Sequence, residues 1–178
     1  MKSPKTKLGR TLLPKFLLVA ATLLVYGQAL QFDFAGYDDD AYVTYNPYVR
    51  RGLTPDGLHW AFTTGHSANW HPLTWLSHMA DVEIYGLHPG GHHATSLLLH
   101  ILNSLILLVL LTRMTQCTWR PLFVAGLFAL HPLHVESVAW VSERKDVLST
   151  FWGLLAILAY LGYAKRKRLF RYLLVFLL

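Results

Sequence analysis

Residues 94–111 read ATSLLLHILNSLILLVLL, a stretch of 18 positions without Asp, Glu, Lys or Arg. A helix needs roughly 20 mainly apolar residues to cross about 30 Å of hydrocarbon. Inside a bilayer only helices and closed barrels satisfy their own backbone polar groups. This stretch therefore predicts a transmembrane helix and an all-α integral membrane fold.

Similar apolar segments lie on both sides of this stretch. Residues 12–30 and 147–164 are of comparable length, and residues 121–135 form a shorter segment. A further apolar run, 169–178, stops without a polar tail, so we expect a truncated fifth span and a chain that is a fragment. The sequence thus predicts four complete spans and the start of a fifth.

The composition excludes several classes of protein. Of the 178 residues, 53% are hydrophobic and only 15% are charged, whereas a soluble domain carries about 25% charged residues. The single cysteine, Cys117, excludes an intrachain disulfide framework and a cysteine-rich zinc site. A soluble enzyme is not expected.

The charges are divided between alternate segments. Twelve of the 16 Lys and Arg residues lie in 1–15, 112–120 and 165–171, which contain no Asp or Glu. The segments 31–93 and 136–146 hold the other four cations and all ten acids, a net charge of 4 − 10 = −6. By the positive-inside rule these two segments are external loops. The net charge of +6 thus reflects topology, and we expect no nucleic-acid partner.

The first apolar segment follows a basic front, as a signal peptide does. Its apolar part exceeds the roughly 7 to 15 residues of a signal peptide, and Tyr26–Ala29 is a poor cleavage site. We therefore predict an uncleaved anchor preceded by a cytoplasmic tail, residues 1–11.

The loop 31–93 contains two predicted short helices. Thr54 is an N-cap residue followed by Pro55 at the first helical position. A second helix begins at Pro72 and runs toward Tyr85 with apolar residues at helical spacing. We expect both to lie along the membrane surface, where the tryptophans of this loop suit the interface.

The run Asp38-Asp39-Asp40 begins eight residues after the first predicted span. Crowded carboxylates are costly to keep ionised without a nearby cation, so the run suits a general base or a metal site. In an extended backbone Asp38 and Asp40 would point one way and Asp39 the other. The first arrangement favours a divalent metal held by Asp38 and Asp40, the second favours a lone base, and a solvated acidic turn is the alternative.

Histidines gather on the predicted external side. Seven lie in the loop 31–93, and His92 begins a stripe that continues through Ser96, His100 and Asn103 on one helical face. Ionisable groups at membrane depth indicate function, and hydrogen bonding between helices is the alternative. A metal site made of His71, His131 and His134 is a weaker reading of the same residues.

The segment 131–146, HPLHVESVAWVSERKD, combines acids with the adjacent cations Arg144 and Lys145. At the headgroup level these cations could hold a lipid phosphate. The alternative is an anchoring pair that contacts headgroups or neutralises Glu143 and Asp146.

Five segments carry a resemblance to the N-terminal membrane part of the transmembrane and tetratricopeptide-repeat proteins. They are FAGYDDDAYVTYNPYV (34–49), GLTPDGLHWAFTT (52–64), NWHPLTWLSHM (69–79), GLHPGGHHATSLLLH (86–100) and ALHPLHVESVAWVSERKDVLS (129–149). Members of this family are similar to protein O-mannosyltransferases and share the multi-span helical bundle of C-type glycosyltransferases. The resemblance implies a polyprenyl-phosphate-linked sugar, of mannose type, as donor and a protein Ser or Thr hydroxyl as acceptor.

The resemblance also implies roles for individual residues. The acidic motif of the family's first external loop maps onto Asp38 and Asp39, with Glu136 assisting. Arg144 and Lys145 become phosphate contacts, and the candidate substrate-binding histidines are His134, His71 and His92. The resemblance assigns no definite cofactor, and a divalent metal at the acidic motif is the candidate. The later spans and the tetratricopeptide repeats of the family are absent from these 178 residues.

The sequence therefore suggests two alternative functions. The first is a membrane glycosyltransferase in a bacterial inner membrane, with its active face outside the cytoplasm. The second is a non-catalytic membrane scaffold or lipid-binding subunit, in which the carboxylates only shape the loop.

Sidedness is testable with cysteines introduced singly beside Asp39 and at Lys167, in a chain carrying Cys117→Ser. A membrane-impermeant thiol reagent should label the first only from outside and the second only after the membrane is opened. Labelling of both from the same side would contradict the predicted topology.

Overall fold

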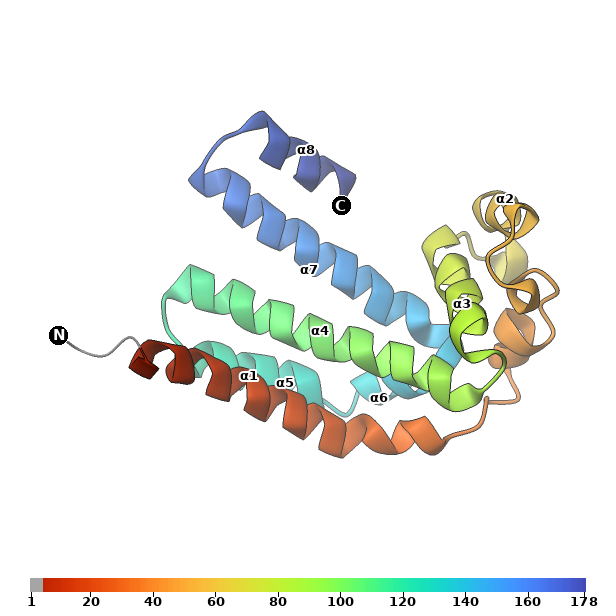
Figure 1. The fold of residues 1–178 in the computed structure, drawn as a ribbon, viewed down its shortest axis with the longest axis horizontal. Coiled ribbons are helices and arrows are strands. Elements are labelled where there is room, and N and C mark those ends of the chain that lie inside the picture. The colour runs from red at the N-terminus through yellow and green to blue at the C-terminus, as the bar shows by residue number, and fades with distance from the viewer. Residues whose placement is uncertain (1–4) are drawn as a thin grey trace. The chain divides into compact units, whose positions relative to one another are not determined.

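The computed structural model describes residues 5–178, so the part of the predicted cytoplasmic tail that includes Lys2 lies outside the described residues. Within that range every long regular element is an α-helix (Figure 1). The helices are α1 (Lys5–Tyr26), α2 (Pro55–Thr63), α3 (Pro72–Tyr85), α4 (Pro89–Thr115), α5 (Trp119–Leu130), α6 (His134–Ala139), α7 (Arg144–Lys165) and α8 (Leu169–Leu177). The predicted all-α class is confirmed.

Short helical turns connect these helices. Four are 3₁₀ turns and one, Asp40–Thr44, is a π-helical turn. The 3₁₀ turns are Gly27–Gln31, Val49–Arg51, His66–Ala68 and Val141–Glu143.

The chain divides into two compact units. The span unit consists of Met1–Val25, Leu99–His134 and Ser149–Leu178. The loop unit consists of Tyr26–Leu98 and Val135–Leu148, and therefore contains both predicted external loops, 31–93 and 136–146. Each unit is described by itself below.

Among residues 5–178, three helical segments are long and apolar enough to cross a membrane. They are Leu12–Gln31, Pro89–Thr115 and Val141–Lys165. These segments contain the predicted spans that begin at positions 12, 94 and 147. Two extend several residues further than their apolar runs, because polar first turns continue the helix into the loop unit.

The third apolar segment differs from the sequence prediction. α5 has 12 residues and ends at Leu130, so at 1.5 Å per residue it covers about 18 Å. His131, which precedes Pro132, has φ −66° and ψ 129°, as the steric clash between a proline and its preceding residue favours. The helix therefore omits the last five positions of the predicted segment 121–135.

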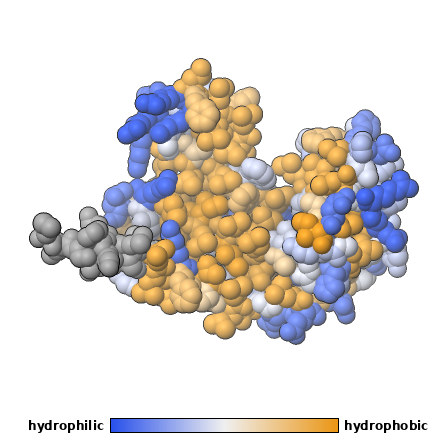
Figure 2. All heavy atoms as spheres, in the orientation of Figure 1, coloured by the Kyte–Doolittle hydropathy of each residue, from blue (hydrophilic) through white to orange (hydrophobic). Residues whose placement is uncertain are grey.

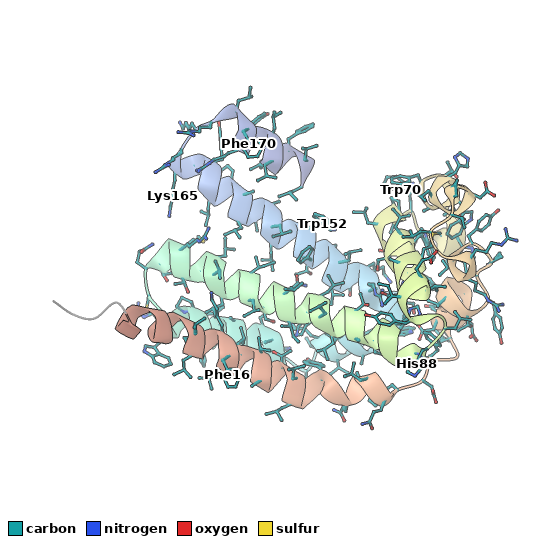
Figure 3. The ribbon with its side chains drawn as sticks, in the orientation of Figure 1. Phe16, Trp70, His88, Trp152, Lys165 and Phe170 are labelled. Atoms are coloured by element: carbon teal, nitrogen blue, oxygen red, sulfur yellow. The ribbon has the colours of Figure 1, made fainter. Side chains whose placement is uncertain are left out.

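The span unit has a small core and a large apolar surface. Leu18 of α1, Leu108 of α4, and Ala125 and Ala129 of α5 pack together. Large apolar side chains elsewhere on these helices are exposed, and Figure 3 shows two of them, Phe16 and Phe170. Figure 2 shows continuous hydrophobic surface over the long helices. An apolar surface of this extent fits contact with lipid.

The loop unit has a conventional buried core. Its members come from the π turn, the 3₁₀ turn Val49–Arg51, α2, α3 and the 3₁₀ turn before α7. They are Tyr42, Val43, Val49, Ala61, Trp75, Met79 and Val141. The two helices predicted in this loop are confirmed. Thr54 caps α2 by accepting from the Gly57 backbone N–H at 3.1 Å, and Pro72 is the first residue of α3.

The turn between α3 and α4 depends on small residues. A Cβ atom added at Gly90 would lie 2.6 Å from the Leu30 carbonyl oxygen, and one added at Gly91 would overlap the base of the Tyr85 side chain. Glycine at 91 lets the start of α4 lie against Tyr85 at the end of α3, and glycine at 90 lets it lie against the 3₁₀ turn Gly27–Gln31.

Gly90→Ala should destabilise the protein by about 1–3 kcal/mol, because backbone atoms must move to admit the methyl group. Gly126→Ala in α5 is the matched control, since nothing lies within 4 Å of its added Cβ. Thermal unfolding in detergent measures both. Equal melting temperatures for the two variants would contradict the close approach at Gly90.

Candidate functional site

The acidic run is helical, so the extended backbone assumed from the sequence is wrong. Asp38 and Asp39 form a helical turn, with φ −59° and ψ −29° at Asp39, and Asp40 begins the π turn. The Asp40 carboxylate accepts a hydrogen bond from the Thr44 hydroxyl at 2.6 Å. This local bond favours the turn over a strand. Successive side chains of the run therefore point around a helix axis.

Asp39 is fully buried and joins two distant segments. Its Oδ1 accepts from the Ser142 backbone N–H at 2.8 Å and from the Ser142 hydroxyl at 2.7 Å. Its Oδ2 accepts from the Ala35 backbone N–H at 2.8 Å. Three donors compensate for the loss of water around this carboxylate. Asp39 thus connects the acidic turn to the start of α7.

Asp38 precedes Tyr42 by four residues in successive helical turns, and unlike Asp39 it is partly exposed. Burial raises the pKa of Tyr42, the Lys145 ammonium opposes this shift, and the carboxylates of Asp38 and Glu143 add to it. The Tyr42 hydroxyl also accepts from the Asn69 side-chain amide at 3.3 Å. The charges of both predicted external segments therefore act at the same hydroxyl.

His71 and Lys145 complete the surroundings of Tyr42. The His71 ring lies 5.6 Å from the Tyr42 ring between centroids. Burial lowers the pKa of His71, and the charge of Lys145 lowers it further, so the imidazole is neutral at pH 7. The Lys145 side chain is 33% exposed and donates to Glu143 at 2.6 Å. We call Asp38, Tyr42, His71 and Lys145 the Tyr42 cluster.

Arg144 lies in the interior of the loop unit and is fully buried. Its guanidinium pairs with Asp81 and donates to the His92 carbonyl oxygen at 2.6 Å. It also donates to the hydroxyls of Ser96 at 3.3 Å and Ser77 at 3.1 Å. The structure thus surrounds Arg144 with protein groups and leaves Lys145 as the more accessible of the two predicted phosphate contacts.

A group of potential metal ligands adjoins this ion pair. His78, Asp81 and His92 are all buried, and one ligand atom from each lies within 4.8 Å of the others. Burial lowers the pKa of His78 well below its usual value, with the Arg144 charge as the next cause. Neither His78 nor Asp81 is among the site residues predicted from the sequence. The two residues are three positions apart on the helix predicted from Pro72, so they lie on one face. This spacing could have indicated that they form a site together.

That group includes neither Asp38 nor Asp40, the predicted metal ligands. Metal binding by those two aspartates, or by His131 and His134 with His71, stays a prediction. His131 and His134 lie in the span unit, where their rings are 6.1 Å apart between centroids.

The polar stripe of α4 is used for contacts inside the protein. His100 hydrogen-bonds the Ala129 carbonyl oxygen of α5 at 2.9 Å, and its own carbonyl accepts from Ser104 at 2.9 Å. Ser96 accepts from Arg144. Hydrogen bonding between helices, the alternative for Ser96 and Asn103, therefore holds for Ser96, which bonds to α7. His100 makes a second such bond, to α5.

The remaining candidates are Glu136 and His134. Glu136 is exposed in α6 and belongs to the loop unit, whereas His134 belongs to the span unit. The His134 ring packs against Phe128, with centroids 4.7 Å apart. The role expected for these two residues near Asp38 and Asp39 stays a prediction.

The loop unit also has aromatic residues at its surface. Trp70, in the segment between α2 and α3, is 68% exposed and donates from its indole nitrogen to the Phe62 carbonyl oxygen at 2.9 Å. His88 lies at the turn between α3 and α4 (Figure 3). Exposed tryptophans beside apolar helices suit a membrane interface.

Known proteins resemble this chain over most of its length. Protein O-mannosyl-transferase TMTC1 of Homo sapiens is 34% identical over 172 residues, which cover 89% of the chain and 19% of that protein. Protein O-mannosyl-transferase TMTC1 of Mus musculus is 35% identical over 157 residues, covering 81% of the chain and 16% of that protein. Protein O-mannosyl-transferase TMTC4 of Homo sapiens is 29% identical, with 86% and 23% covered.

The chain thus spans less than a quarter of the length of these curated relatives. No protein-family model and no solved structure matches it.

Arg144→Met should destabilise the protein by about 3–5 kcal/mol, because it leaves Asp81 buried without its partner. Lys145→Met, at the neighbouring and partly exposed ion pair, should cost at most about 1 kcal/mol. Unfolding in detergent micelles measures both. Similar losses in the two variants would show that the Arg144 ion pair does not organise the loop unit.

Proposed function

The chain belongs to the family of transmembrane and tetratricopeptide-repeat protein O-mannosyl-transferases, and on this premise we propose that its Tyr42 cluster transfers a sugar to protein hydroxyl groups. The donor in this proposal is a polyprenyl-phosphate-linked sugar of mannose type. The acceptor is a Ser or Thr side chain. The names of the relatives suggest the reaction class, and the charges around Tyr42 suggest where the reaction takes place.

Asp38 is the proposed general base. The acceptor oxygen bonds to the anomeric carbon of the sugar, the bond from that carbon to the phosphate oxygen breaks, and the hydroxyl proton passes to a carboxylate. Asp38 suits this task because it is partly exposed, whereas Asp39 is fully buried and accepts three hydrogen bonds. Asp39 holds the turn on which Asp38 lies. This difference between adjacent carboxylates is the observation that carries the proposal.

Lys145 is the proposed contact for the departing phosphate. The leaving group is already anionic, so it needs a nearby positive charge more than a proton. Lys145 supplies that charge beside Tyr42, and the neutral imidazole of His71 can exchange hydrogen bonds with the sugar or phosphate. Arg144 acts from the interior by fixing the first turn of α7, on which Lys145 lies. Glu136 is retained as an assisting carboxylate.

A membrane location suits a lipid-linked donor. The candidate spans support a location in a bilayer, and the charge distribution of the sequence supports a loop unit on the side opposite the cytoplasm. A polyprenyl tail would remain in the bilayer while its phosphate reaches the Tyr42 cluster. We keep the bacterial inner membrane as part of the proposal, although the relatives named above are from human and mouse.

The test is sugar transfer by the full-length protein in detergent, using a synthetic polyprenyl-phosphate mannose and a Ser- and Thr-containing acceptor peptide. Asp38→Asn should lower kcat by about 10²–10⁴-fold, the usual contribution of a general base. Asp33→Asn is the matched control, because Asp33 is an exposed carboxylate of the same loop. Its kcat should match that of the original protein.

Undiminished transfer by Asp38→Asn would remove the assigned base. Absence of transfer by the original protein, together with binding of the lipid donor, would favour the alternative of a non-catalytic lipid-binding subunit or scaffold. Lys145→Gln should weaken donor binding in either case, because the variant loses a phosphate contact. Unchanged donor binding would remove Lys145 from the proposed site.

A further inference from the structure

We propose that His78, Asp81 and His92 bind one divalent transition-metal ion of the zinc type inside the loop unit. This site is separate from the metal predicted at the acidic run, and it does not depend on the proposed sugar transfer. Two imidazoles and one carboxylate form a ligand set that zinc sites use, with a further coordination position left for a small molecule such as water.

The spacing of the three side chains fits such an ion. The ligand atoms lie within 4.8 Å of one another, and His92 Nδ1 is 3.5 Å from Asp81 Oδ2. In a tetrahedral site with bonds of about 2.0–2.1 Å, neighbouring ligand atoms are separated by about 3.4 Å. The His92 and Asp81 atoms already have this separation, so only His78 needs to approach.

The hydrogen bonds of His92 fix which nitrogen faces the site. Its Nε2 is 3.1 Å from the Gly86 carbonyl oxygen, which can only accept, so the proton lies on Nε2. In the neutral ring Nδ1 then carries a lone pair and faces the Asp81 carboxylate. Two lone pairs at this distance repel unless a cation lies between them. Metal-bound histidines commonly show the same pattern, with the second nitrogen donating to a backbone carbonyl.

His78 provides an independent indication. The residue is fully buried, and neither of its ring nitrogens has a hydrogen-bond partner. Burying a polar group without a partner costs about 1–3 kcal/mol. Coordination of an ion by one of these nitrogens would remove part of that cost. His78 therefore has an unused ligand atom in the same group as a carboxylate and a second imidazole.

Asp81 is held as metal-bound carboxylates usually are. Its Oδ1 accepts from the Thr95 hydroxyl at 2.7 Å, and its Oδ2 pairs with Arg144. Outer partners of this kind orient a ligand and tune the site. Arg144 also adds a positive charge next to the proposed ion, which by itself disfavours binding.

The total buried charge offsets this effect. The described residues of the loop unit that are both charged and buried are Asp39, Asp81 and Arg144, which sum to −1 when the histidines are neutral. Asp39 also acts electrostatically on Arg144. A net negative charge inside the protein attracts a cation, and a divalent ion changes the sum of these buried charges from −1 to +1. The alternative occupant is a proton on His92 Nδ1, and the experiment distinguishes the two.

The test uses the full-length protein purified in detergent without chelator. Elemental analysis should find about one zinc per chain. After removal of zinc, added Co²⁺ should give the visible absorption of a tetrahedral site. His78→Gln and His92→Gln should each weaken Co²⁺ binding by at least about 100-fold, since even outer partners of a ligand are worth about 10–100-fold. His59→Gln, which removes an exposed histidine of the same loop, should bind Co²⁺ unchanged.

His78→Cys keeps the proposal testable where the other variants fail to fold. A thiolate is also a zinc and cobalt ligand, so this variant should retain the ion and gain a sulfur-to-cobalt charge-transfer band. Absence of bound metal in the original protein, or binding that His78→Gln and His92→Gln leave unchanged, would overturn the site. Saturable binding without the charge-transfer band in His78→Cys would also overturn it, because the ion would then lie elsewhere.

Discussion

The buried ion pair between Arg144 and Asp81 is the constraint on which the loop unit depends. A charge enclosed in protein is tolerated only with partners. Arg144, the first residue of α7, has its partners in α3 and in the first turns of α4. One side chain therefore connects three helices that are far apart in the sequence. The fully buried Asp39 adds a second connection of the same kind, through Ser142.

The burial of Asp39 and Arg144 explains why neighbouring residues differ in role. Asp39 and Arg144 face the interior, whereas the adjacent Asp38 and Lys145 remain partly exposed beside Tyr42. In the proposed transfer reaction, the buried Asp39 and Arg144 fix the backbone, and the partly exposed Asp38 and Lys145 meet the substrate. Catalysis by a base and a cation requires that both groups be held in position and remain accessible to the substrate. Buried neighbours that fix the backbone would meet the first requirement.

Several features of the fold were predictable from residue patterns. The long apolar runs, the N-cap Thr54 and the first-turn proline Pro72 specify helices locally. Length, apolarity and the residues of the first helical turn are properties of adjacent residues. The end of α5 was misplaced, since apolarity continues through Leu133 while the proline at 132 stops the helix. The candidate site was found only in part, and the inward positions of Asp39 and Arg144 were not visible in the sequence.

The sequence alone determined that this is a helical membrane chain with its acids and most of its histidines in two loops, since charge and hydrophobicity are written residue by residue. Tertiary structure decided which member of each adjacent pair is buried, because that depends on contacts across 103 positions between Asp39 and Ser142 and 63 between Asp81 and Arg144. It also brought His78 of α3 and His92 of α4 to one carboxylate. Such proximity arises from packing between helices, to which the order of residues gives only indirect clues.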